Sequence, residues 1–253
     1  MKKQFDDELH TLSLSDDGSY TAYSKEYGEH YHSTKDGALQ ESLKKHIIPA
    51  FELVQKDEVH ILDICFGLGL NTLGTIYYTQ KYFPNKKLYI YSPELDEKLI
   101  SSLEFFTYPK EFKDLKKIIT ALSQTQHYED ERVCVEVFLG DAREYVKRFS
   151  KRFDIVYQDA FSPSANPMLW TQEYFADIKN AMKKDGILTT YSTALKTRLA
   201  LHNNNFLLYL NKGEGYRNAT VATLQPTKLF EAVDMAHKIS CNPDVKPLRD
   251  AEL

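Results

Sequence analysis

From residue 59 to residue 192, short apolar runs alternate with longer segments that carry a helical pattern. Strands that alternate with helices usually pair in parallel, because each connection crosses a face of the sheet before the next strand begins. The alternation therefore predicts an α/β protein with a mostly parallel, doubly wound sheet. The predicted strands cover residues 59–64, 87–92, 133–139, 153–158 and 187–192, and the clearest helices cover 70–82 and 171–184.

The segments on either side of this alternation predict antiparallel structure. Near the N-terminus, apolar and polar residues alternate around Asp16-Asp17-Gly18, which is typical of a β-hairpin, and a helix is expected from about residue 36. Towards the C-terminus, residues 205–210 and 219–224 predict a hairpin that closes the sheet. We therefore expect a β-hairpin and helix extension over residues 1–45 and the main domain over residues 46–253.

Charge and composition narrow the possible classes of protein. The formal net charge of −4 gives no overall attraction for nucleic acid, so an RNA partner would need local basic runs such as residues 110–117. Apolar runs are too short to span a bilayer, and residues 1–7 lack the apolar stretch of a signal peptide. Three scattered cysteines predict neither a disulfide framework nor a metal site. We expect a cytoplasmic monomer without a metal.

The loop after the first predicted strand is the sharpest local motif. It reads Asp63-Ile-Cys-Phe-Gly67-Leu-Gly69-Leu-Asn71 and lies between a strand and a helix, where open α/β sheets bind nucleotide-like ligands. A loop that binds the pyrophosphate of a dinucleotide would read GxGxxG. Here an acid precedes two glycines with a different spacing, which suits a ligand that has an ammonium group and no phosphates. We expect Asp63, Gly67, Gly69 and Asn71 to contact this ligand.

Two further acids follow the next two predicted strands. Glu94 comes just after the second strand, where a carboxylate can accept hydrogen bonds from both hydroxyls of a ribose. Asp141, preceded by Gly140, follows the third strand, where a carboxylate can accept a hydrogen bond from an adenine amine. Either acid alone could be an ordinary turn residue or helix cap. Acids after three successive strands converge on one crevice, and together with the glycine loop they predict S-adenosylmethionine as the ligand.

Asp159 ends the fourth predicted strand, whose other residues are mostly apolar, so it is expected at the mouth of the same crevice. Phe161 and the only tryptophan, Trp170, lie close by in the sequence. A carboxylate beside aromatic side chains can orient an amine nucleophile and stack a planar base. The alternative is structural: prolines such as Pro163 shape a rigid loop, and Trp170 packs in the core.

Taken together, these stretches resemble the methyltransferase part of the tRNA 5-methylaminomethyl-2-thiouridine biosynthesis bifunctional protein family, in its single-domain form. The resemblance implies a class I, Rossmann-like fold with a seven-stranded sheet. It also implies methyl transfer from S-adenosylmethionine to an aminomethyl group on the wobble uridine of tRNA, with Asp159 as the catalytic residue and with substrate contacts from Tyr31, Phe161, Pro163 and Trp170. The matching stretches run from about residue 20 to 225 and include Tyr31-His-Ser, Phe66-Gly-Leu-Gly-Leu-Asn71, Asp159-Ala-Phe-Ser-Pro163 and Trp170-Thr171.

Two departures from the pattern of that family matter. Cys65 stands where the loop often carries a first glycine, and no second GxGxxG follows, so the FAD-dependent half of the bifunctional protein is expected to be absent. A rival reading is a polyamine aminopropyltransferase, which uses decarboxylated S-adenosylmethionine, although the loop lacks the Gly-Asp-Gly-Gly run of those enzymes. A second rival is a non-catalytic RNA or protein interaction module, which the set of four acids disfavours.

Overall fold

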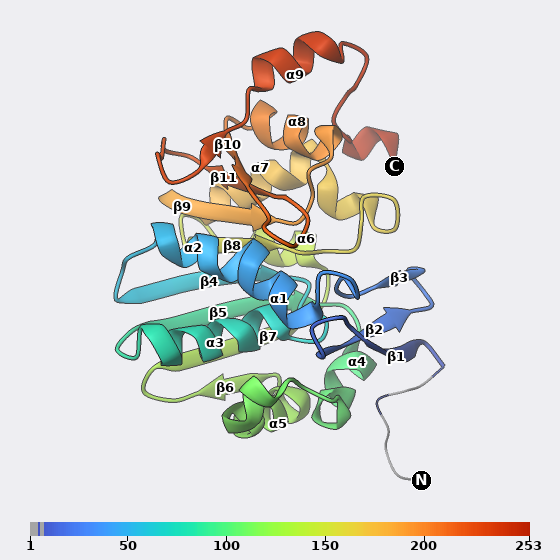
Figure 1. Cartoon of the computed structure of the whole chain (residues 1–253), viewed down its shortest axis with the longest axis vertical. Helices are drawn as coiled ribbons and strands as arrows, with labels where there is room; N and C mark the ends of the chain where they lie inside the picture. Colours follow the sequence, from blue (N-terminus) through green and yellow to red (C-terminus); the bar gives the residue numbers. More distant parts are fainter. Residues whose placement is uncertain (1–4, 6–7) are drawn as a thin grey trace.

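The computed structural model describes residue 5 and residues 8–253 of the chain. Residues 1–4, 6 and 7, which belong to the stretch where the sequence predicts no signal peptide, lie outside the described part. Among the described residues, nine strands form one mixed sheet, and three more form a small antiparallel sheet beside it (Figure 1). The predicted α/β architecture with a mostly parallel, doubly wound sheet is confirmed.

The central strands of the large sheet are parallel. The first of them in the sequence lies in the middle, and later strands are added on either side of it. The chain runs outward one way from β4 (Glu58–Ile64) to β5 (Lys87–Glu94) and β7 (Val133–Leu139), and the other way to β8 (Phe153–Gln158) and β9 (Met182–Thr190). Open α/β sheets bind ligands outside the carboxyl ends of the strands at such a switch point. The fold therefore places a crevice next to the loop that follows β4.

The antiparallel part of the large sheet contains the predicted C-terminal hairpin and two strands that were not predicted. β10 (Leu207–Asn211) pairs with β11 (Ala219–Thr223), which pairs with β9. The additional strands are β6 (His127–Glu129) and β12 (Glu231–Ala232), one at each edge, so the seven expected strands become nine. Both are too short to show an apolar alternation, and they form because an edge strand offers unpaired backbone groups.

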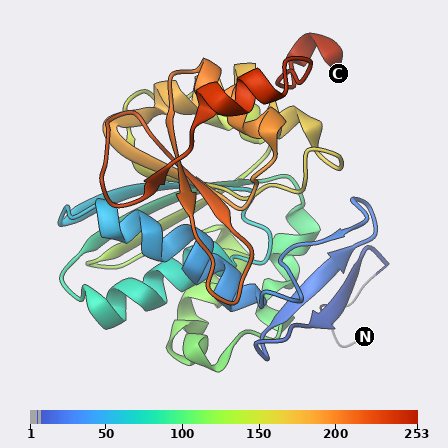
Figure 2. The ribbon, with the colours of Figure 1, turned by 45° about the horizontal axis from the view of Figure 1, so that its top comes forward.

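Alternation of side chains along the strands builds two hydrophobic cores, one on each face of the sheet. On β4, Val59 and Ile61 belong to one core, whereas Leu62 and Ile64 belong to the other. Figure 2 shows the sheet between two layers of helices. The first core includes α2 (Ile48–Leu53), α3 (Leu70–Tyr82), α4 (Glu97–Ser102) and α5 (Lys116–Thr125), and the second includes α6 (Ala142–Val146), α7 (Gln172–Ala181), α8 (Leu195–Asn203) and α9 (Met235–Cys241).

The N-terminal segment forms a three-stranded antiparallel sheet, of which the predicted hairpin is the first part. β1 (His10–Leu14) pairs with β2 (Tyr20–Ser24), and β3 (Glu29–His30) adds to β2. In Figure 1 this sheet lies beside the carboxyl ends of the central strands. The chain after β3 therefore passes directly over the crevice.

The predicted helix that follows is built in three parts: α1 (Ala38–Glu41), a π-helical stretch (Ser42–Ile47) and α2. In a π-helix each N–H bonds five residues back, so a turn holds one more residue than an α-helical turn, and such turns occur often at functional sites. Within this stretch Lys45 and His46 are both buried. A lysine and a histidine inside the protein require polar partners, and these partners define the site described next.

Candidate active site

A cavity of about 1250 Å³ lies at the carboxyl ends of β4, β5, β7 and β8. One side is formed by the loops that follow these strands, including Gly67, Glu94, Gly140, Asp141 and Asp159. The other side is formed by the N-terminal segment from Glu26 to Lys35. The cavity therefore joins the predicted cofactor residues to a segment that precedes the parallel sheet in the sequence.

Backbone conformation explains the glycines in the loop after β4. Gly67 has a φ of +54°, and a Cβ atom there would lie 3.0 Å from the Tyr31 ring. Gly69 has a φ of +72° and would place a Cβ atom 2.7 Å from the Phe66 ring. Cys65 also takes a positive φ, of 65°, which is unusual for a side chain of its kind. The backbone at Cys65 therefore takes a conformation that a glycine would adopt easily, and this conformation is strained for a cysteine.

The carboxylate of Glu94 holds this loop against the end of β5. Its Oε2 accepts a hydrogen bond from the Gly67 N–H at 2.8 Å, and its Oε1 accepts from the N–H groups of Leu95 and Asp96. Burial raises the pKa of Glu94, although these backbone hydrogen bonds oppose the shift. Glu94 lines the cavity, so the carboxylate both shapes the loop and faces the space where a ligand would bind.

Gly140 and Asp141 occupy the corresponding position at the end of β7. The Gly140 N–H donates to the Glu94 carbonyl at 2.8 Å, which joins the two strand ends. The Asp141 carboxylate caps α6 by accepting from the Arg143 N–H at 2.6 Å. Both residues line the cavity. Asp141 can cap α6 and still accept a hydrogen bond from a ligand in the cavity, because a carboxylate has several acceptor sites.

Asp63 and Gly69 do not line the cavity, although the sequence placed both in direct contact with the ligand. Asp63 is fully buried beneath the loop, where its Oδ2 accepts a hydrogen bond from the Thr72 hydroxyl at 2.7 Å. Burial, with a smaller contribution from the negative charge of Asp159, raises the pKa of Asp63 to about 7. The structure therefore gives Asp63 a position behind the loop that supports its start.

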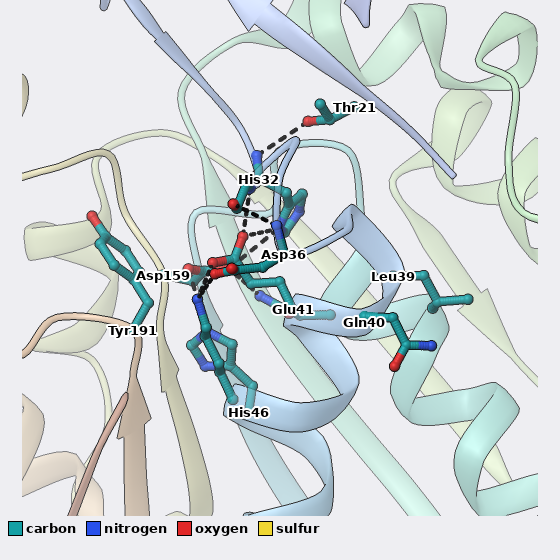
Figure 3. Close-up of polar contacts among 12 residues, drawn as sticks. Thr21, His32, Asp36, Leu39, Gln40, Glu41, His46, Asp159 and Tyr191 are labelled. Atoms are coloured by element: carbon teal, nitrogen blue, oxygen red, sulfur yellow. Dashed lines mark hydrogen bonds and ion pairs between the residues drawn. The ribbon is translucent and has the colours of Figure 1, made fainter. Parts of the chain in front are cut away.

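Asp159 follows β8, and Figure 3 shows His32 and His46 directed towards its carboxylate. Asn71 donates to Oδ2 at 2.8 Å, while His46 Nε2 lies 3.3 Å from Oδ1 and His32 Nδ1 lies 3.8 Å from Oδ2. Burial would raise the pKa of Asp159, but the imidazoles of His46 and His32 and the Asn71 amide outweigh it and lower this pKa. The structure thus keeps a buried carboxylate ionised at the floor of the cavity.

A second layer of charged groups lies behind His32. Glu41 accepts from the Ser33 N–H at 2.6 Å and from the Lys45 ammonium at 2.7 Å, and its Oε2 lies 3.8 Å from His32 Nδ1. Lys45 also bonds Asp36 at 2.6 Å, and Asp36 contacts the exposed Arg217 at 3.2 Å.

Sequence reasoning missed this group of charged residues behind His32. Its one sequence signal is the spacing of Glu41, Lys45 and His46 in the predicted helix, which is also common on solvent-facing helices.

Aromatic side chains form a wall of the cavity near Asp159. Phe161 stacks on Tyr27 with 4.5 Å between ring centroids, and Tyr31 lies 4.9 Å from Phe161. The next residue, Ser162, is held by hydrogen bonds from its N–H and its hydroxyl to the Glu29 carboxylate. Tyr31 and Phe161, two of the predicted aromatic residues, therefore lie together in the cavity lining, and Tyr27 lies there with them.

Pro163 and Trp170, which the sequence also placed at the substrate, lie outside the cavity lining. Trp170 is 1% exposed, packs against Phe175 and Tyr191, and donates its Nε1–H to the Phe161 carbonyl at 2.8 Å. Its position matches the structural alternative, in which the tryptophan packs in the core and supports the loop. It fixes Phe161 from behind.

Within the described part of the chain, no group of three or more His, Cys, Asp and Glu side chains is arranged to hold a metal ion. The same residues contain no helix that is both long enough and apolar enough to cross a membrane.

Comparison with known proteins relates this cavity to a family. The model of a family described as S-adenosyl-L-methionine-dependent methyltransferase matches residues 109–225. The crystal structure of MNMC2 from Aquifex aeolicus is 30% identical, superposes with a TM-score of 0.85, and the match covers 99% of this chain and 82% of that one. Spermidine synthase from Thermotoga maritima has a TM-score of 0.53 at 17% identity, which shows a shared fold alone.

Two curated relatives are longer than this chain. An uncharacterized protein of Methanocaldococcus jannaschii is 28% identical over 97% of this chain and 64% of its own length. The tRNA 5-methylaminomethyl-2-thiouridine biosynthesis bifunctional protein MnmC of Azoarcus sp. is 29% identical over 78% of this chain and 32% of its own length. The chain thus spans about a third of the bifunctional relative.

Proposed function

The chain belongs to the family of S-adenosyl-L-methionine-dependent methyltransferases that includes MNMC2 of Aquifex aeolicus, and on this basis we propose its substrate. It N-methylates 5-aminomethyl(-2-thio)uridine at the wobble position of tRNA, which gives the 5-methylaminomethyl form. Relatives named for the biosynthesis of that nucleoside in tRNA support the proposal. The observation that carries it is the ionised, buried carboxylate of Asp159 beside an aromatic wall, which fits an amine attached to a planar base.

The residues of the cavity fit the cofactor of this family. The sulfonium and the ammonium of S-adenosylmethionine are cationic, and carboxylates of Glu94, Asp96 and Asp141 line the cavity. Gly67 leaves room that a Cβ atom would fill. Glu94 would accept the ribose hydroxyls, and Asp141 would accept the adenine amine. When bound, S-adenosylmethionine supplies a methyl group on a positively charged sulfur.

The acceptor end of the cavity suits a cationic amine. An aliphatic amine has a pKa of about 10, as in lysine, and therefore enters as an ammonium at neutral pH. Asp159 can pair with this ammonium, and Asn71 and His46 fix the carboxylate so that its direction is set before the substrate arrives. Correct positioning of two reactants supplies about 7–11 kcal/mol in favourable cases. Phe161, held by Trp170 and Ser162, would stack the uracil ring.

The deciding experiment is methyl transfer from labelled S-adenosylmethionine to tRNA that bears 5-aminomethyluridine. We expect transfer by the wild-type chain, and for Asp159→Ala we expect undiminished cofactor affinity with a loss of rate of about 100-fold or more. Wild-type protein that binds the cofactor but transfers no methyl group to this tRNA would contradict the proposal. Incubation with putrescine and decarboxylated S-adenosylmethionine tests the aminopropyltransferase alternative, for which spermidine would be the product.

A further inference from the structure

The proposed reaction must release a proton inside a buried site. The substrate enters as an ammonium and the product is a methylated ammonium, so the conversion of one into the other by a cationic methyl donor frees one proton per turnover. The amine must lose this proton before its lone pair can attack. Asp159 alone is a poor place for the proton to rest, because its Oδ2 accepts a hydrogen bond from the Asn71 amide at 2.8 Å, which favours the ionised carboxylate.

His32 is placed to receive the proton from Asp159. Its ring lies in the lining of the cavity, and its backbone N–H is anchored to the Thr21 hydroxyl at 3.1 Å. Its Nδ1 lies 3.8 Å from Asp159 Oδ2 and 3.8 Å from Glu41 Oε2 (Figure 3). Within the described residues this nitrogen is buried without a hydrogen-bond partner. One uncommitted ring nitrogen therefore stands midway between an inner and an outer carboxylate.

His46 differs from His32 in a way that separates their roles. It is fully buried, and its Nδ1 is already engaged with the Thr189 hydroxyl at 3.1 Å. Its Nε2 faces Asp159 and is, like Nδ1 of His32, buried without a hydrogen-bond partner, but among the residues that the structure describes no second carboxylate lies next to it. His32 thus has a second carboxylate, Glu41, to which a proton can pass, whereas the only carboxylate beside His46 in the described residues is Asp159. His46 is thus suited to orienting the carboxylate.

The charges of the cluster balance when one further cation is present. Asp36, Glu41 and Asp159 are three carboxylates, against the two cations Lys45 and Arg217. One negative charge remains for a bound ammonium when both imidazoles are neutral. A proton that moves from the ammonium to His32 leaves the total charge of the cluster unchanged. This matters because a change of net charge in a buried site is costly.

We propose, on the basis of the function proposed above, that His32 accepts through Asp159 the proton that the substrate ammonium loses. The N–H bond at the substrate breaks and its electron pair stays on nitrogen, which becomes the nucleophile. An O–H bond forms at Asp159 Oδ2 and then breaks as an N–H bond forms at His32 Nδ1. From there the proton passes to Glu41 Oε2, and a water molecule in the cavity that Glu41 lines accepts it, which restores the carboxylate.

The test compares His32→Gln with wild type over a pH range from about 7 to about 10, with tRNA that bears 5-aminomethyluridine as substrate. We expect kcat/KM of the variant to be about 100-fold lower near neutral pH and to approach wild type towards pH 10. The recovery is expected because the amine then loses its proton in solution. His46→Gln should be slower at every pH, and His202→Gln, on the exposed side of α8, should match wild type.

A second variant keeps the proposal testable if His32→Gln does not fold. Glu41→Gln interrupts the same path one step further out and should show the same recovery at high pH. Parallel pH profiles of wild type and both variants would overturn the relay, as would a recovery in His46→Gln equal to that in His32→Gln. These outcomes leave the proposed function intact, which fails separately if the wild-type chain does not methylate this tRNA.

Discussion

The imidazole Nε2 of His46 lies 3.3 Å from the carboxylate Oδ1 of Asp159, and the two residues come from opposite sides of the first parallel strand in the sequence. His46 belongs to the π-helical stretch and Asp159 follows β8. The contact joins the N-terminal segment to the crevice of the main sheet. The contact therefore places a side chain of the helix before β4 against one at the edge of the sheet.

The loop after β4 predicts a matched pair of glycine substitutions. Gly67→Ala adds a Cβ atom at a φ of +54° and places it 3.0 Å from the Tyr31 ring, whereas Gly18→Ala adds one at a φ of +79° with nothing within 4 Å. We expect Gly18→Ala to lose about 1 kcal/mol of unfolding free energy and Gly67→Ala to lose more. Only Gly67→Ala should weaken cofactor binding, which calorimetry can measure. Equal effects of both variants would show that the contact with Tyr31 does not matter.

The half-buried carboxylate of Glu94 predicts a cofactor-binding defect without unfolding. Glu94→Ala removes an acceptor that lines the cavity and holds the Gly67 N–H. The loss of charge-assisted hydrogen bonds should weaken binding of S-adenosylmethionine by roughly 1.5–3 kcal/mol, or about 10- to 100-fold in Kd. Glu104→Ala, at an exposed position, is the control. An unchanged Kd for Glu94→Ala would remove this residue from the ribose role.

The raised pKa of Asp63 predicts an unusual dependence of stability on pH. An aspartate is protonated below about pH 3.9 in the unfolded chain, whereas in the folded protein the pKa of Asp63 is about 7. Between these two values the folded state binds more protons, so the contribution of Asp63 to the free energy of unfolding falls as pH rises through this window. The total change is of the order of 4 kcal/mol at most.

The substitution Asp63→Asn should remove this dependence, because asparagine does not ionise and can still accept from Thr72. Urea unfolding at pH about 5 and about 8 should therefore show the variant gaining relative to wild type at the higher pH. Asp244→Asn, at an exposed position, is the matched control. A constant difference between Asp63→Asn and wild type at both pH values would contradict the assignment.

The stack of Phe161 on Tyr27 predicts a substrate defect that leaves the cofactor site unchanged. Phe161→Leu keeps apolar bulk but loses the aromatic face, which is worth about 1–3 kcal/mol per stacked base. We expect KM for the modified tRNA to rise while the Kd of S-adenosylmethionine stays constant. Tyr82→Leu, on an exposed part of α3, should change neither constant. A rise in the cofactor Kd of Phe161→Leu would mean that the wall belongs to both ligands.

Patterns that repeat along the chain predicted the fold well. On β4, Ile61 packs on one face of the sheet and Leu62 on the other. The sequence predicts this strand because the apolar type of each residue indicates that its position is buried. α7 ends at Ala181, before the predicted Lys184, since residues from Met182 pair with β8 instead of continuing the helix. Intrinsic helix preference is weak compared with strand pairing in a buried sheet.

The site was only partly predictable, for a different physical reason. Glu94 ends a strand, and Asp141 and Asp159 follow strands, so the topology alone brings them to one edge of the sheet. His32 and Lys45 follow no strand of that sheet, and their burial depends on contacts between distant segments that no local pattern reports. Three further statements stay predictions: the division of the chain into an extension and a main domain between residues 45 and 46, the monomeric state, and the cytoplasmic location.

The π-helical stretch from Ser42 to Ile47 widens the helix between α1 and α2. A π-helical turn takes up one residue more than an α-helical turn, so deletion of one residue here would restore regular α-helical bonding and change the directions of the side chains inside the stretch. Lys45 and His46 would then lose their present directions towards Glu41 and Asp159. The wide turn therefore holds Lys45 against Glu41 and the next residue, His46, against Asp159, so that one helix contacts both carboxylates.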